Sequence, residues 1–271
     1  MSAPAPAADA PPAARAGFLY RLNPLAKLAA VIPATVLLVF VRDVATPLAF
    51  VALAYLVLLA GAHLTGRLLL VLAVAVPVGI AIVGCGFSLW VDRGLVSDTP
   101  VVLQVGGWAL HAGALAIGFA TALRLGAIIS IALVAGITTS GSDLARSLVQ
   151  QLRVPYRIGY TALAAFRFVP RFAHDLDVIR QAHRVRGAHG GRGPFAAVAR
   201  WFGYIVPLLA GAIRHAERVA LAMDARAFGA YPDRTERHLV PFRTRDAVFI
   251  ALAWAVSAAL FILFFPWGIA P

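Results

Sequence analysis

The fold is decided by two stretches, FRFVPRFAHDLDVIRQAHRVRG at residues 166–187 and WFGYIVPLLAGAIRHAERVALAMDARAFG at residues 201–229. In each stretch apolar residues recur at spacings of three and four, which predicts a long amphipathic helix. Each contains a proline and ends in an arginine flanked by small residues. Both stretches belong to an arginine-rich segment of a chain that is otherwise apolar, so we expect a polar helical unit inserted into a hydrophobic framework.

The composition places the chain among integral membrane proteins. It is 61% hydrophobic and only 13% charged, whereas soluble domains average roughly 25% charged residues. The single cysteine, Cys85, lies in an apolar run, which excludes a disulfide framework and a thiol-based metal site. Arginine supplies all the positive charge except that of Lys27.

Five nearly uncharged runs are long enough to cross a bilayer as helices. A short loop or hairpin is expected around residues 101–107, before the fourth run. The alternative for residues 101–138 is a pair of short spans, which would reverse the orientation of everything that follows. The five predicted spans cover residues 22–41, 44–66, 68–91, about 109–137 and about 248–265.

The charge distribution predicts the orientation. Residues 139–246 hold 17 arginines and eight acidic residues, a net charge of +9. With four spans before this segment, the only basic loop residues on the far side of the membrane are Arg42 and Arg93. Positive loops stay in the cytoplasm, so we expect a cytoplasmic N-terminus, a cytoplasmic insert and a C-terminus on the far side.

The predicted fold is an all-α integral membrane protein with about five transmembrane helices and a cytosolic insert of long amphipathic helices before the last span. Ser140 and Asp143 supply N-cap chemistry for a short helix at residues 144–152 that opens the insert. The expected parts are a disordered Ala/Pro-rich tail at 1–17, a four-span membrane domain at 18–138, a cytosolic helical domain at 139–246 and the last span at 247–271.

Arg186 and Arg226 are the strongest candidate site residues. Each is the last charged residue before a glycine helix stop, and the two are 40 positions apart. A guanidinium with small neighbours can bind a partner's carboxylate through two parallel hydrogen bonds, although a single such arginine more often only complements the helix dipole. Two matching helix ends favour a docking role. The triplets concerned are Val185-Arg186-Gly187 and Ala225-Arg226-Ala227.

Several stretches, in this order, resemble the transmembrane T component of energy-coupling-factor (ECF) transporters, the CbiQ/BioN-like family. The resemblance covers most of residues 18–250. One departure concerns the family's Ala-Arg-Gly signature, since neither triplet matches it fully and only the arginine is common to both. The stretches are RLNPLAKL (21–28), TTSGSDLARSLVQQLRVP (138–155), RFVPRF (167–172), IRQAHRVRGA (179–188) and ALAMDARAFGAYPDRT (220–235).

The resemblance implies a non-catalytic subunit of a bacterial cytoplasmic-membrane importer for a vitamin or metal ion. It implies that Arg186 and Arg226, with their triplets, dock into grooves on two ABC-type ATPase subunits. ATP and Mg are then bound by those subunits, and this chain binds no cofactor directly. The membrane part is expected to grip a substrate-binding S component, which ATP-driven closure of the ATPases would topple. Lipid is an expected partner, and nucleic acid is not.

Other polar residues give weaker signals. Arg124 lies in an apolar run, where a charge at bilayer depth costs about a few kcal/mol. Its guanidinium is expected either to pair helices or contact a partner, or to reach the membrane–water interface. A different placement of the span would also explain it. His174, His183 and His189 lack the i,i+4 spacing of paired helical ligands, so no metal site is expected. The GAHGGRG loop at 187–193 lacks the Lys-Ser/Thr pair of a phosphate-binding loop.

Three other functions compete with this one. A permease of another ABC importer class would couple through a short loop, but Gly187 and Ile205-Val206-Pro207 are too far apart for its spacing. A membrane enzyme acting on anionic lipid would need a clustered acid, histidine or serine site, and none stands out. A membrane-tethered nucleic-acid binder would need its arginines on one face, with binding that falls steeply with salt.

Overall fold

The computed structural model describes residues 17–264, apart from residues 64, 93, 95, 106–107, 188–193 and 233–234. The predicted tail at 1–17 therefore lies outside the described residues, except for Gly17. Contacts divide the chain into two compact units. Residues 1–140 and 241–271 form one, here called the membrane unit, and residues 141–240 form the other, here called the inserted unit.

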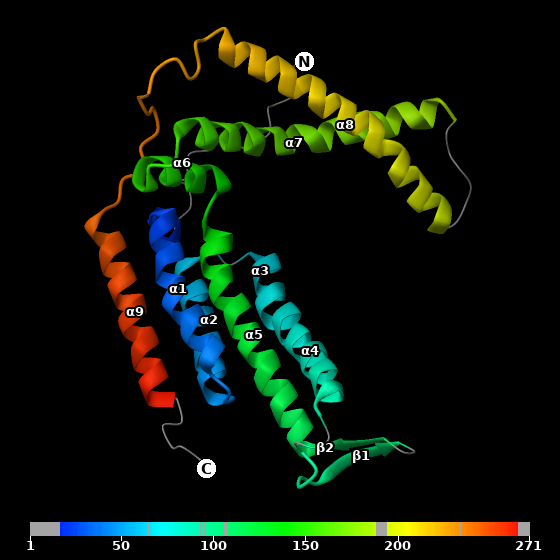
Figure 1. The fold of residues 1–271 in the computed structure, drawn as a ribbon, viewed down its shortest axis with the longest axis vertical. Helices are drawn as coiled ribbons and strands as arrows, with labels where there is room; N and C mark the ends of the chain where they lie inside the picture. The colour runs from blue at the N-terminus through cyan, green and yellow to red at the C-terminus, as the bar shows by residue number, and fades with distance from the viewer. Residues whose placement is uncertain are drawn as a thin grey trace. The chain divides into compact units, whose positions relative to one another are not determined.

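The membrane unit consists of apolar helices that run side by side (Figure 1). Three segments of it are long and apolar enough to cross a membrane, and two 17-residue helices lie at the short end of the range for a span. The all-α membrane fold is therefore confirmed. The helices are α1 (Pro24–Phe40), α2 (Ala45–Gly61), the continuous segment Gly66–Trp90, α5 (Ala112–Thr138) and α9 (Thr244–Phe264), preceded by the single turn η2 (Phe18–Arg21).

Residues 101–138 form a hairpin and one long helix, not two short spans. Strands β1 (Val101–Val105) and β2 (Trp108–His111) pair antiparallel, and α5 then runs for 27 residues. The fourth span starts slightly later than predicted because residues 108–111 are held in the strand pairing. Four helical segments thus precede the inserted unit, as the sequence predicted.

The segment Gly66–Trp90 contains a π-helical turn, η3 (Val71–Ala75), between α3 (Gly66–Leu70) and α4 (Val76–Trp90). Its cause is Pro77, which has no N–H to donate and disturbs the preceding turn. The Val76 N–H bonds to the Val71 carbonyl, five residues back. In the same five-residue pattern the Leu72 carbonyl would pair with the nitrogen of Pro77, which has no hydrogen to donate. It accepts the Tyr55 hydroxyl of α2 at 2.7 Å instead.

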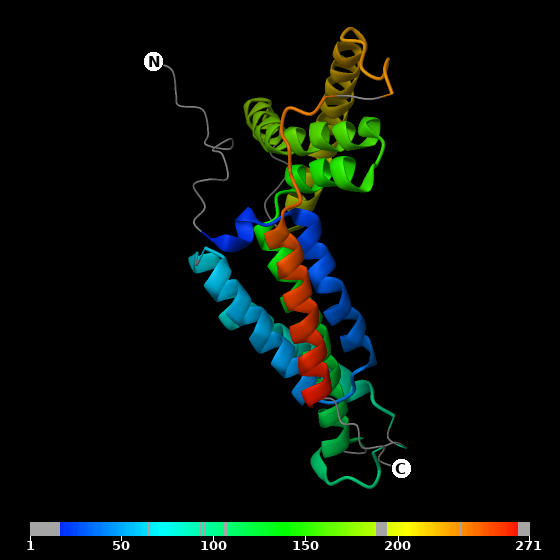
Figure 2. The same cartoon turned by 90° about the vertical axis from the view of Figure 1, so that its left-hand side faces the viewer.

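Small residues allow a close contact between α4 and α5 in the membrane unit. A Cβ added to Gly118 would lie 2.6 Å from the backbone nitrogen of Ser88 and 2.7 Å from the carbonyl oxygen of Gly84. Such small-residue contacts are typical of helices packed in lipid, where apolar burial alone gives little preference between helix and lipid. On another side of the unit α9 packs against α1 and α2 and is seen between them in Figure 2.

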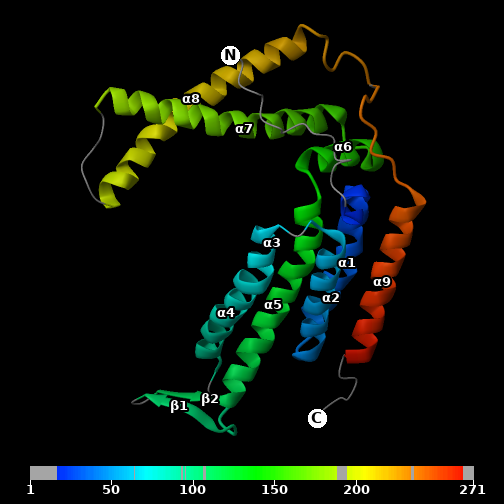
Figure 3. The same ribbon diagram turned by 180° about the vertical axis from the view of Figure 1, so that it is seen from behind.

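The inserted unit contains α6 (Gly141–Leu152), α7 (Tyr156–Val185) and α8 (Pro194–Asp224). At 30 and 31 residues, α7 and α8 are each about 45 Å long. They cross in an antiparallel sense, with their C-terminal ends on opposite sides of the crossing (Figures 1 and 3). Phe168 stacks on His215 with ring centroids 4.9 Å apart, and His183 meets Tyr204 edge-on at 5.3 Å.

The apolar stripe predicted along these helices is largely uncovered. On α8 the large members Val198, Phe202 and Leu209 are exposed, and on α7 Ile158 and Val169 are exposed. Phe172, Leu176 and Ile179 on α7 are half-buried. The contact between α7 and α8 uses a different set, in which Phe168 and His215 take part. Within the described residues of this single chain, the α8 part of the stripe therefore faces outward.

Candidate functional site

The C-terminal end of α7 places Arg186 at the helix cap. Val185 is the last helical residue, and Arg186 still donates its backbone N–H to the Ala182 carbonyl at 3.1 Å. Gly187 follows with a φ of +68° and donates to the Arg184 carbonyl at 3.1 Å. A residue in this left-handed region ends the helix, and glycine adopts it without steric cost.

The end of α8 has the same local geometry. Asp224 is its last helical residue, and Ala227 has a φ of +53°. The Ala227 N–H donates to the Asp224 carbonyl at 2.9 Å, and the Phe228 N–H donates to the Met223 carbonyl at 3.0 Å. This pair of bonds is the usual closure of a helix whose next residue is left-handed.

The two predicted arginines therefore occupy the same position, the cap residue directly before the left-handed one. Both side chains are exposed, as are Val185 and the two alanines that flank Arg226. Within the described part of the chain, neither guanidinium forms an ion pair. The arrangement presents a fixed positive charge at the tip of each long helix, available to an acidic group on another molecule.

The α8 end is tied to the start of α7. The Arg157 guanidinium donates to the Gly229 carbonyl at 2.6 Å, and the Tyr156 hydroxyl donates to the Tyr231 carbonyl at 2.6 Å. The Phe228 ring packs edge-on against Tyr156, with centroids 5.6 Å apart. At the α7 end, a Cβ added to Gly187 would meet none of the described residues within 4 Å.

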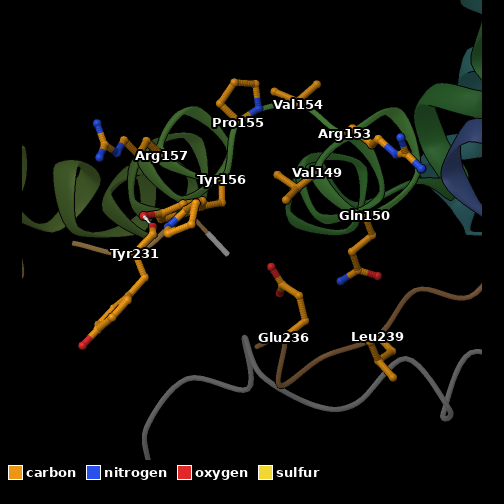
Figure 4. A pocket seen from close by; sticks show the side chains of 11 residues that line it. Val149, Gln150, Arg153, Val154, Pro155, Tyr156, Arg157, Tyr231, Glu236 and Leu239 are labelled. Carbon is orange, nitrogen blue, oxygen red and sulfur yellow. Dashed lines mark hydrogen bonds between the residues drawn. The ribbon is translucent and has the colours of Figure 1, made fainter. Parts of the chain in front are cut away.

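A hollow of about 840 Å³ opens beside this attachment, between the α6–α7 turn and the residues Tyr231, Pro232, Glu236 and Leu239 (Figure 4). Glu236 and Gln150 reach into it from the two sides. Gln150 donates to the His238 carbonyl at 2.8 Å and accepts the Val240 N–H at 2.8 Å. This side chain therefore binds the backbone of residues 238–240 to α6. The Tyr160 hydroxyl donates to Glu236 at 2.9 Å.

The residues that support the α8 tip could not be identified from the sequence. Gln150, Tyr156, Arg157 and Tyr160 bond to residues 72–90 positions further along the chain. The only sequence signal was their position next to Pro155, where the chain turns between helices. That signal marks a turn but does not identify what the turn contacts.

Arg124 pairs two helices within the membrane unit. Its guanidinium donates to the Val41 carbonyl at 3.1 Å, and Val41 is the C-cap of α1. A cation at this position complements the negative end of the α1 dipole and satisfies a carbonyl that the helix itself leaves unpaired. Arg124 belongs to a different unit from Arg186 and Arg226, and no described contact joins it to either.

His183 is engaged in a ring contact rather than in a described group of possible metal ligands. His183 contacts Tyr204, and His189 lies outside the described residues. Among the residues that the structure describes, no group of three or more His, Cys, Asp or Glu side chains is placed to hold a metal ion.

The left-handed conformation of Ala227 leads to a prediction. A left-handed backbone costs a non-glycine residue roughly 1–2 kcal/mol, so Ala227→Gly should stabilise the end of α8 by about 1 kcal/mol. The reverse change at the other tip, Gly187→Ala, should destabilise the end of α7 by a similar amount. Hydrogen exchange of the amides at 225–230, followed by mass spectrometry, measures the first effect.

The matched control for this prediction is Ala225→Gly, the same exchange two residues earlier and on the helical side of the cap. It should destabilise the last turn by up to about 1 kcal/mol, because glycine has a lower helix propensity than alanine. Residue 225 has no left-handed strain that glycine could remove. If Ala225→Gly and Ala227→Gly shift exchange in the same direction, the left-handed conformation at Ala227 does not determine the stability of this end.

Apolar helices of membrane-spanning length, with a separate unit of two long crossed helices, define a polytopic helical membrane protein that carries a polar insert. Residues 16–237 match the model of the CbiQ family, described as cobalt transport proteins, and the chain belongs to this family. The match includes both arginine-tipped helix ends and the whole of α1 to α8.

Relatives with the name energy-coupling factor transporter transmembrane protein EcfT occur in several bacteria. The Staphylococcus aureus protein is 24% identical over 91% of this chain and 92% of its own length. The Streptococcus equi protein is 27% identical over 90% and 92%, respectively. The Limosilactobacillus fermentum protein is 30% identical over 69% of this chain and 76% of its own. The similarity thus extends over both units.

Proposed function

We propose that this chain is the transmembrane coupling (T) subunit of an ECF-type importer, which transmits ATP-driven motion to a substrate-binding S component for vitamin or metal-ion uptake. The observation that carries the proposal is the left-handed residue that directly follows each of the exposed arginines Arg186 and Arg226, at the ends of two long crossed helices. The names of the EcfT relatives support the transporter class.

The docking step follows from the chemistry of the tips. Each guanidinium offers five donors in a plane that matches a carboxylate. We assign one tip to each of two ABC-type ATPase subunits, with Val185, Gly187, Ala225 and Ala227 as the small or exposed neighbours that admit the partner. ATP and Mg belong to those subunits, and this chain is assigned no catalytic role.

The exposed stripe of the inserted unit supports a second kind of contact. Phe202, Val206 and Leu209 on α8 are 67%, 73% and 56% exposed, and uncovered apolar surface of this kind indicates a protein or lipid partner. We assign the partner to the membrane-embedded S component and the surrounding lipid. A stiff helix of about 45 Å can carry motion from its tip to this stripe.

The orientation rests on charge. Residues 139–246 carry a net charge of +9 and adjoin apolar spans on both sides. Positive segments of this kind remain in the cytoplasm. We therefore assign the inserted unit and the N-terminus to the cytoplasmic side of the cell membrane, where ATPase subunits have access to ATP. The C-terminus is assigned to the far side.

Co-purification tests the proposal most directly. The tagged chain, extracted from its native membrane in mild detergent, should bring down two ATPase subunits and a small apolar membrane protein, identified by mass spectrometry. Recovery of the chain without any ATPase, under conditions in which it stays folded and monodisperse, would refute the coupling role. Co-purification with anionic lipid alone would favour the lipid-binding alternative.

A further inference from the structure

Two charged side chains are buried in the membrane unit close to the points where the chain enters and leaves the inserted unit. Lys27 on α1 is 2% exposed, and Asp246 on α9 is completely buried. The boundaries between the units fall after Ser140 and after Val240. A buried charge is costly unless it is paired or hydrogen-bonded, so the contacts of these two groups should reveal what they hold in place.

Asp246 joins the start of α9 to the start of α1. One carboxylate oxygen accepts the Arg243 N–H at 2.8 Å, a bond of the kind that a third-position acid makes back to the cap of its helix, here α9. The other oxygen accepts the Asn23 N–H at 2.8 Å. Asn23 is itself the N-cap of α1, where its side chain accepts the Leu25 N–H at 2.9 Å. One carboxylate thus serves two helix N-termini, both of which favour negative charge.

Lys27 joins the same end of α1 to the end of α5. Its ammonium group donates to the Thr138 carbonyl at 2.7 Å and to the Thr138 hydroxyl at 3.2 Å. Thr138 is the last residue of α5, where a cation is favourable for the helix dipole. Thr138 stands just before the first boundary between the units, and Asp246 stands just after the second.

Asn23 and Lys27 are four positions apart, so they lie above one another on one face of the chain at the start of α1. We propose that these two residues form a two-point anchor, with Asp246 and Thr138 as their partners, that holds both chain connections of the inserted unit to α1. Motion of the inserted unit is then delivered to α1 as well as to α5 and α9, and these residues act as positioning residues for coupling.

The chemistry of the anchor explains two features of the sequence. Lys27 is the only lysine beside 23 arginines, and its compact ammonium, unlike a planar guanidinium, can point its donors at a helix end from a confined position. The Asn23-Pro24 pair provides an N-cap followed by a residue preorganised for the first helical position. The transport part of this inference rests on the proposed function, whereas the anchor itself does not.

The first measurement is independent of transport. Lys27→Met keeps an unbranched apolar side chain and removes the hydrogen-bond donors. Asp246→Asn replaces one carboxylate oxygen by an NH2 group, which cannot accept the backbone N–H that it faces. In lipid nanodiscs, we expect Lys27→Met to speed hydrogen exchange at residues 138–140, and Asp246→Asn at residues 243–246, by about tenfold. Exchange in the middle of α7 and α8 should stay unchanged.

Trp254→Phe is the matched control, because it removes another hydrogen bond between α9 and α1. The Trp254 indole donates to the Ala29 carbonyl at 3.0 Å, away from both boundaries. It should leave exchange at both connections within about twofold of the original chain. Unchanged exchange in Lys27→Met and Asp246→Asn, or equal acceleration in Trp254→Phe, would overturn the anchor.

The second measurement uses the complete transporter in proteoliposomes. Lys27→Met and Asp246→Asn should lower substrate uptake by about tenfold while ATPase association and ATP hydrolysis stay within about twofold, a separation that a merely misfolded chain would not show. Normal uptake, or a parallel loss of uptake and hydrolysis, would overturn the positioning role. If the unaltered chain binds no ATPase, the proposed function fails, and the exchange experiment still decides the anchor.

Discussion

Replacing Arg186 and Arg226 together by glutamate should weaken the binding of an ATPase dimer to this chain by roughly a thousandfold. Each reversal removes a charged hydrogen-bonding group from a desolvated contact, which costs about 2 kcal/mol or more, and about 1.4 kcal/mol corresponds to a factor of ten. The tips lie at opposite ends of a crossed helix pair, so the two effects should add. Titration of the chain in nanodiscs with purified ATPase subunits measures the loss.

Arg218→Glu is the matched control for charge reversal. Arg218 is an exposed arginine within α8, eight positions before Arg226 and away from the end of that helix. If docking depends on the tip, Arg218→Glu should weaken binding by no more than about threefold, as expected for a peripheral charge. Equal weakening by Arg218→Glu would show that only the general positive field matters. Unweakened binding of the double variant would exclude both tips as docking sites.

Gly118→Ala should lower the melting temperature of the protein by about 5–10 °C. The new methyl group would lie 2.6 Å from the Ser88 nitrogen and 2.7 Å from the Gly84 carbonyl oxygen, both in the backbone of α4. A backbone contact cannot be relieved by rotating a side chain, so α4 and α5 must separate. Overpacking of this kind costs about 1–3 kcal/mol, and about 2–4 °C of melting temperature accompanies each kcal/mol in a protein of this size.

The same substitution elsewhere in α5 provides two controls. Gly136→Ala introduces a methyl group with nothing within 4 Å, so it should leave the melting temperature unchanged or raise it slightly through helix propensity. Gly126→Ala would meet only the Ile80 side chain, which can rotate away, and should fall between the other two. Size-exclusion profiles after heating in detergent measure all three. Equal losses would mean that helix separation is not the cause.

The spans and the long helices were predictable because their signals are local. Uncharged runs marked the membrane helices, and apolar spacings of three and four marked α7 and α8, with Gly187 and Gly229 as stops. The stop of α8 was predicted only in part. Gly229 has a φ of +91°, but the chain already turns left-handed at Ala227, a residue type for which the sequence carries no signal of that conformation.

The contacts that organise the molecule were not predictable, because they join residues far apart in the chain. Asp246 counted in the sequence only as one of eight acidic residues of the insert, yet it is buried and bonds to Asn23, 223 positions earlier. Lys27 stood out in the sequence only as the single lysine, whereas in the structure its ammonium group donates to the Thr138 carbonyl. Neither pairing leaves a trace in hydropathy or spacing.

The attachment of the α8 end to Tyr156 and Arg157 has a consequence for how that tip meets its partner. A tip that is already held in place loses little conformational entropy when a partner captures it. The bonds from Tyr156 and Arg157 have already ordered the chain that follows Arg226, so Arg226 should bind an acidic group at a low entropic cost.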